Sequence, residues 1–132
     1  MEESSTKTLC NNFAQILGGC HSFQKNMCIV EVTRNIQLTI MGHPSSTTSF
    51  GFFAFVSINK KNEMELNIGD FPLLEKEVSP FIQELRMQGI KISAVKSHWL
   101  FNEPKLFHVN FRSIDEPLSF AKKVRNAINV LS

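Results

Sequence analysis

The side chains best able to do chemistry lie in one stretch, residues 92–111, which reads ISAVKSHWLFNEPKLFHVNF. It holds Trp99, the only tryptophan, and two of the four histidines, His98 and His108. A polar loop around Glu103 separates two apolar runs, and loops held by extended segments commonly carry binding residues. Imidazole changes charge near neutral pH, and indole presents a flat apolar surface with one polar atom. We therefore expect a ligand-binding site at this loop.

Strand alternation predicts which of these side chains share a face. In the first run the even-numbered apolar positions face the core, so Lys96 and His98 fall at the rim of the core face. In the second run the odd-numbered positions face the core, which sends His108 and Asn110 to the opposite face. A one-residue slip, or a bulge near the loop, would bring all four onto one face. The hydrophobic pattern favours the first register, so we predict no metal cluster and no catalytic residue.

Each loop residue has a plainer interpretation beside the functional one. The preferred interpretation of His98 is a structural histidine that holds the loop in place by a hydrogen bond, and the second is a residue that contacts a ligand in a pocket. A catalytic base or metal ligand ranks last, because no carboxylate or cysteine lies at a fitting spacing. Trp99 is expected to anchor the loop against the core, although it also suits ligand stacking. Glu103 is expected to be solvated, but folded towards His98 it would support acid–base chemistry.

Other candidate residues have weaker patterns. Cys20-His21 could combine a thiolate with an imidazole, but adjacent residues usually point apart. Arg34 is expected to be an exposed turn residue. His43 begins a polar loop whose Ser and Thr side chains could bind a ligand, although simple solvent exposure is the preferred interpretation. The chain has no phosphate loop, nucleophile elbow, paired-histidine metalloprotease motif or dinucleotide fingerprint, so we expect no cofactor.

The length of 132 residues predicts one domain spanning residues 1–132. Hydrophobic residues make up 42% and charged residues 20%, as in ordinary globular domains. The net charge of +2 comes from scattered Lys and Arg, which argues against nucleic-acid binding. Cys10, Cys20 and Cys28 form no CxxC pair, which is typical of a reducing compartment where cysteine is a small buried hydrophobe. With no signal segment or membrane-length apolar run, we expect a cytoplasmic protein without membrane contact.

Phenylalanine is over-represented, with twelve Phe against one Trp and no Tyr. Phe adds apolar area without a polar atom that needs a partner, so we expect a core filled with Phe. A row of exposed Phe would instead mark an interface, for example a homodimer joined through residues 50–55.

The periodicity predicts the order helix, four strands, helix, two strands, helix. Helices are expected at 6–17, 74–89 and 118–131, and strands at 28–33, 36–40, 50–58, 64–68, 90–97 and 106–111. Arg34-Asn35 is expected to be a two-residue hairpin turn, and 42–49 a surface loop. Pro80 either kinks the second helix or starts a shorter one capped by Ser79. These elements predict an α+β domain with a mainly antiparallel sheet of about six strands and three helices packed on one face.

Several segments resemble one family. They are HSFQKNMCIVEVTRNIQLTIMGHPSS, the helix ending in QGI, ISAVKSHWLFNEPKLFHVNF and IDEPLSFAKKVRNAINVL. Together they resemble the LppY/LpqO-like domain of unknown function, in the short single-domain type found in bacilli. The resemblance covers nearly the whole chain and implies a bacterial protein with the family's fold.

The resemblance also implies a site. The family pattern is a His-x-His pair before the loop and a further His in the second strand. His98 matches the second His of the pair, whereas Lys96 and Asn110 replace the other two. His108 stands where the family has an aromatic or apolar residue, and His43 where relatives have Arg. Because protonated Lys is a poor metal ligand, these replacements favour binding over catalysis.

We therefore predict a small cytoplasmic binding module for a small polar or anionic ligand. The residues expected to line its site are Lys96, His98, Trp99, Glu103, His108 and Asn110. A metal-assisted hydrolase and a homo-oligomeric interaction protein without a ligand are the alternatives.

Overall fold

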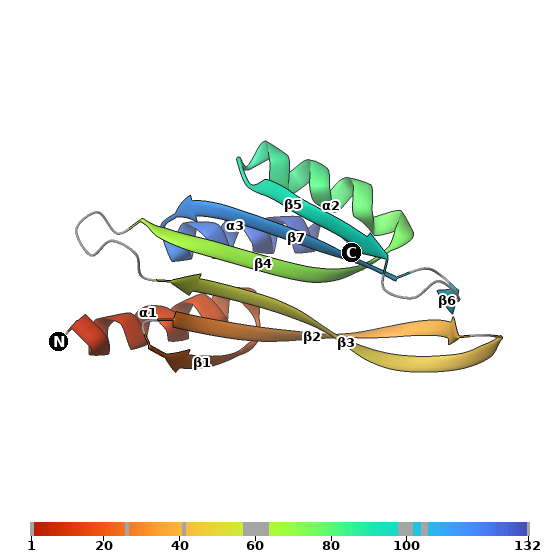
Figure 1. The fold of residues 1–132 in the computed structure, drawn as a ribbon, viewed down its shortest axis with the longest axis horizontal. Coiled ribbons are helices and arrows are strands. Elements are labelled where there is room, and N and C mark those ends of the chain that lie inside the picture. Colours follow the sequence, from red (N-terminus) through yellow and green to blue (C-terminus); the bar gives the residue numbers. More distant parts are fainter. Residues whose placement is uncertain are drawn as a thin grey trace.

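The chain forms one antiparallel sheet with helices on one side (Figure 1). The computed structural model describes residues 2–25, 27–40, 42–56, 64–97, 102–103 and 106–131, and their side chains except those of 2–6, 36–40, 45–49 and 102–103. In chain order the elements are α1 (Glu2–Leu17), β1 (Cys20–Gln24), β2 (Met27–Ile40), β3 (His43–Val56), β4 (Glu65–Leu74), α2 (Glu75–Met87), β5 (Lys91–Ser97), β6 (Asn102–Glu103), β7 (Leu106–Asp115) and α3 (Pro117–Asn129).

Six strands lie side by side in the order β1-β2-β3-β4-β7-β5, and the short β6 pairs with β2. Helix α1 packs on β1 and β2, α2 packs on β4, β5 and β7, and α3 contacts both other helices. Within the described ranges no helix covers the other side of the sheet (Figure 1). We call that side the open face, and its members include Phe52, Ile68, Asp70 and His108. The predicted α+β fold is confirmed.

Phenylalanine fills the space between the sheet and the helices, as predicted. The Phe side chains that are at most 1% exposed are Phe13, Phe53, Phe55, Phe71, Phe81, Phe111 and Phe120. Their rings touch one another, as in the edge-on pair Phe13–Phe55, whose centroids are 5.0 Å apart. Fully burying one such side chain stabilises the fold by about 2–3 kcal/mol.

Two glycines allow these rings to lie against the strands. Gly69 is paired with Phe111, and a Cβ at Gly69 would overlap the Phe111 ring. A Cβ at Gly51 would lie 2.7 Å from the Phe71 ring. Any side chain at these two positions would displace a core ring, so glycine is needed there for close approach.

Strand β2 runs without a break through Arg34-Asn35, so the turn expected there is wrong. The chain turns instead at Gly42, whose φ is +84°, and Ile40 pairs with His43. The loop expected at 42–49 is therefore the first part of β3. This part of the β2–β3 ribbon extends past the helices (Figure 1), and β-branched Thr favours strands, so its polar composition does not require a loop.

The three helices lie close to the positions predicted from the periodicity of apolar residues. Helix α1 begins at Glu2, before the expected start at Thr6. Helix α2 continues through Pro80 as one helix, and Glu116 occupies the N-cap position of α3. No helix in the described ranges is long and apolar enough to cross a membrane. Strand β1 was not expected from the sequence.

Arg34 lies in the middle of β2, and its guanidinium makes several polar contacts on the helix side of the sheet. Its Nη1 and Nη2 donate to the two carboxylate oxygens of Glu77, at 2.9 and 3.0 Å. Nη1 also donates to the Pro72 carbonyl at 2.8 Å, and the guanidinium carbon lies 5.4 Å from the centre of the Phe71 ring. The expectation of an exposed turn residue at Arg34 is therefore wrong.

Glu77 connects Arg34 to the start of α2. Its Oε1 also accepts a hydrogen bond from the backbone N–H of Leu74 at 2.8 Å, which satisfies a donor at the helix N-terminus. Burial raises the pKa of Glu77, but the hydrogen bonds from Arg34 and Leu74 and the charge of Arg34 outweigh burial, so the pKa lies below its ordinary value of 4.5. The ionised carboxylate thus joins β2 to α2.

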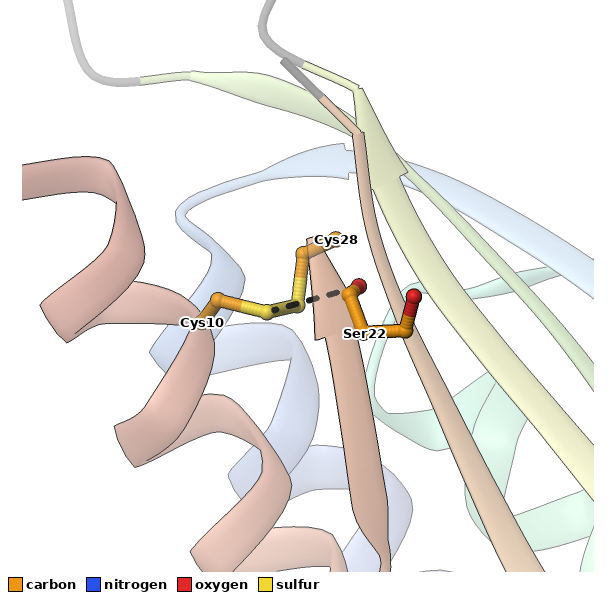
Figure 2. The surroundings of a disulfide bond; sticks show 3 residues. All are labelled: Cys10, Ser22 and Cys28. Carbon is orange, nitrogen blue, oxygen red and sulfur yellow. Dashed lines mark hydrogen bonds between the residues drawn. A yellow bond between two sulfur atoms is a disulfide. The ribbon is translucent and has the colours of Figure 1, made fainter. Parts of the chain in front are cut away.

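A disulfide joins Cys10 on α1 to Cys28 on β2, and both residues are fully buried (Figure 2). Their Cα atoms are 5.5 Å apart, and Cys10 Sγ lies 4.0 Å from the carbonyl oxygen of Ser22 on β1. The expectation of unpaired cysteines is wrong for these two, because packing α1 on β2 brings together residues far apart in the sequence. Cys20 is free and exposed.

Replacing Glu77 with Gln removes the anion from Arg34, and we expect the free energy of unfolding to fall by about 2–3 kcal/mol at neutral pH. Because the folded-state pKa is lowered, this stabilisation is present above pH 4.5 and is lost as the pH falls through the folded-state pKa. Urea unfolding across acidic pH should show a smaller acid loss in Glu77→Gln than in wild type or in the exposed control Glu75→Gln. Equal stability of Glu77→Gln and wild type at neutral pH would contradict this role.

Reducing the Cys10–Cys28 bond should lower the free energy of unfolding by about 3 kcal/mol, because the bond closes a loop across a separation of 18 residues. Guanidinium unfolding with and without dithiothreitol measures the change. The double variant Cys10→Ala/Cys28→Ala should not respond to the reductant, and Cys20→Ser should behave as wild type. An unchanged midpoint on reduction of the wild type would show that no disulfide forms.

Candidate ligand-binding site

The site depends on an irregularity in β5. Going along the strand, Ile92 pairs with Phe111 of β7, but the next paired residue is Ala94, opposite Asn110. Ser93 is left over, which is the pattern of a β-bulge. From that point on, each residue of β5 faces the side opposite to the one that plain alternation predicts.

The bulge brings three of the expected site residues together. Lys96 pairs directly with His108, and residues opposite each other in an antiparallel pair project from the same face. Asn110 lies two residues along on that face, which is the open face. The favoured register, which kept Lys96 apart from His108, is therefore wrong, and the alternative with a bulge is the one observed.

Asp70 on β4 completes this group and was not anticipated. It pairs with Asn110, and its Oδ1 lies 2.9 Å from Nδ1 of His108. The two side chains are partly buried, with 36% of Asp70 and 20% of His108 exposed. The strand predicted here ended at Ile68, so alternation was not carried on to Asp70. We call Asp70, Lys96, His108 and Asn110 the polar cluster.

Two phenylalanines border the polar cluster on β3. Phe52 pairs with Asp70, and Phe50 lies two residues away on the same face. They are 45% and 39% exposed, and their ring centroids are 6.4 Å apart. Exposed aromatic rings beside charged groups provide a surface on which a flat ligand can stack.

The remaining expected residues divide as follows. His98 and Trp99 lie outside the described residues. Glu103 lies in β6, where its backbone pairs with Thr39 of β2, but its side chain is outside the described set. Cys20 and His21 are neighbours on β1 and point to opposite faces, as expected.

The polar cluster combines three kinds of chemistry. Asp70 fixes the orientation of the His108 ring, and when Nδ1 carries the proton Nε2 is the basic nitrogen of the neutral ring. Lys96 supplies a cation for anions, and Asn110 supplies both a donor and an acceptor. Among the described residues, no group of three His, Cys, Asp or Glu could hold a metal ion.

A groove of about 970 Å³ lies on the helix side of the sheet, between α2 and strands β5 and β7. Its lining residues are Glu75, Val78, Ser79, Ile82, Gln83, Arg86, Met87, Val95 and Phe107. It contains none of the polar cluster. Because its charged residues, Glu75 and Arg86, are exposed on α2, whereas the polar cluster holds a hydrogen-bonded pair, we assign the site to the polar cluster.

Residues 11–130 match a family described as Domain of Unknown Function (DUF1259). Neither the curated proteins nor the solved structures contain a match to the chain.

The register can be tested by cross-linking in a Cys20→Ser background. Lys96→Cys with His108→Cys places two thiols on directly paired residues, so we expect an intramolecular disulfide under mild oxidation, detected by mass spectrometry. Val95→Cys with His108→Cys is the matched control and should remain reduced. The reverse result would mean that the strand has no bulge.

Proposed function

The chain belongs to the DUF1259 family of domains, and from that premise we propose that it is a binding module for a small polar or anionic ligand. The ligand is held on the open face by the polar cluster. The observation that carries this proposal is the direct pairing of Lys96 with His108, which places a cation beside an imidazole held by Asp70.

The contacts support a small anion with a flat part. A carboxylate or phosphate group accepts hydrogen bonds from the Lys96 ammonium and, when the ring is protonated, from His108. Asp70 balances the charge of that ring instead of contacting the ligand. The exposed rings of Phe50 and Phe52 then lie where a planar group can stack.

The family subgroup, the bacterial source and the cellular location also belong to this proposal. The segments that carry the resemblance support the LppY/LpqO-like group and a bacterial protein. One reason to expect a cytoplasmic location was the pattern of cysteines. The Cys10–Cys28 disulfide weighs against that reason, because disulfides persist mainly in oxidising compartments.

The Asp70–His108 pair favours one further candidate, which is a hydrolase. In that case His108 takes a proton from water or a substrate hydroxyl while Asp70 holds the ring. The metal-assisted form of this reaction would need ligands beyond the described residues. A turnover number that falls in Asp70→Asn with little change in KM would favour this candidate over binding alone.

The binding proposal is tested by calorimetry and thermal shift against nucleotides, sugar phosphates and small carboxylates. One class should bind, and Lys96→Ala or His108→Ala should weaken it by about 10- to 100-fold, since a hydrogen bond to a charged group contributes about 1.5–3 kcal/mol. The matched control is Lys122→Ala, an exposed lysine on α3 that should leave affinity unchanged. A blank across the panel, or affinity unaffected by Lys96→Ala, would contradict the proposal.

A further inference from the structure

The open face carries two rows of apolar side chains that nothing in the described ranges covers. The strand registers place them across β2, β3, β4 and β7. The first row is Met27, Val56, Leu66 and Ile114, and the second is Ile29, Ala54 and Ile68, which the charged Arg112 continues on β7. Ile114 is 56% exposed and Ile68 43%, and Ile68 lies in the middle of the sheet, between Ala54 of β3 and Arg112 of β7.

An apolar sheet face of this kind normally packs against another layer. Monomeric proteins rarely expose large contiguous apolar patches, and sheets bury such faces against each other at a separation of about 10 Å. We propose that a second copy of this chain covers the open face, so that two sheets form a symmetric sandwich.

The size of the face fits a dimer. Two rows of paired residues run across six strands, from β1 to β5, and a third runs across five, from β1 to β7. With strands about 4.8 Å apart and rows about 6.8 Å apart, the face measures about 29 by 20 Å, or on the order of 600 Å² in flat projection. Because side chains corrugate this surface, its accessible area approaches the roughly 800 Å² per partner that stable interfaces bury.

The pattern of residues is also self-complementary. A twofold axis along the strands, between β3 and β4, places β2 over β7 of the second copy and β3 over β4. The first apolar row then packs on itself, with Met27 over Ile114 and Val56 over Leu66. Arg112 of the second copy lies over Ile29, and Glu31, exposed on β2, is one row away on the same strand, so the opposite charges are diagonal neighbours. The axis brings no like charges directly opposite each other along β2 and β7.

The same arrangement covers part of the polar cluster, because Phe52 of the second copy lies over Asp70 and Glu31 of the second copy lies over Asn110. Under this axis β1 of the second copy lies over β5, but β1 ends at Cys20, which is level with Asn110. Lys96 lies one row further along and stays open to solvent, but β2 continues past Glu31, so Thr33 of the second copy lies over His108. Ligand binding and dimer formation are therefore expected to compete for this part of the open face.

Sedimentation equilibrium tests the dimer directly. We expect wild type to form a dimer at micromolar concentration, and Ile68→Glu or Ile114→Glu to raise the dissociation constant by about 30-fold or more. Met87→Glu is the matched control, because Met87 is 74% exposed but lies on α2, away from the open face. Circular dichroism establishes that each variant is folded.

A charge exchange tests the axis. Glu31→Arg and Arg112→Glu should each weaken the dimer, and the double variant should restore its affinity. A wild type that remains monomeric at about 100 µM would overturn the proposal. So would a dimer that resists both Ile68→Glu and Ile114→Glu, a dimer disrupted by Met87→Glu, or charge variants whose effects add instead of cancelling.

Discussion

Coverage of one sheet face by all three helices is the constraint on which the rest of the structure depends. In a strand, successive side chains point to opposite sides, so this one-sided cover sorts every strand residue into a core set or an open set. The core set is dominated by phenylalanine, which closes over glycines such as Gly69. The open set holds the polar cluster and the exposed apolar rows. An irregularity that shifts the alternation of side chains along a strand therefore changes which residues share a face. The bulge at Ser93 is such an irregularity.

The interaction between Arg34 and Glu77 shows how a charged residue can occupy the core side. A guanidinium there would be costly alone, but Glu77 neutralises it, the Pro72 carbonyl accepts a hydrogen bond and the Phe71 ring lies beneath it. Gly51 leaves space for that ring. This contact lets β2 remain a strand where its sequence resembles a turn, and it fixes the start of α2 against the sheet. The disulfide from Cys10 to Cys28 joins α1 to the same strand.

The sequence predicts the fold class, the three helices and the Phe core because long periodic patterns and composition express them directly. It misplaces the first hairpin because Asn35 suits a turn, and the partner that holds Arg34 is more than forty residues away. Likewise, no local pattern shows that Cys10 meets Cys28. At the candidate site, Lys96, His108 and Asn110 are predicted from residue type, strand position and the family resemblance. The sequence does not predict that these residues share one face, because the apolar residues of β5 alternate as they would without a bulge. It also misses Asp70, which lies beyond the end of the strand predicted from the alternating pattern.

The central claim is that the bulge places Lys96 beside His108 on the open face. Nuclear Overhauser effects between the two strands in isotope-labelled protein measure this most directly. The structure predicts cross-strand contacts from Lys96 to His108 and from Ala94 to Asn110. Contacts from Lys96 to Phe107 and from Ala94 to Val109 would instead mean that the strands pair without a bulge, and the polar cluster would not exist.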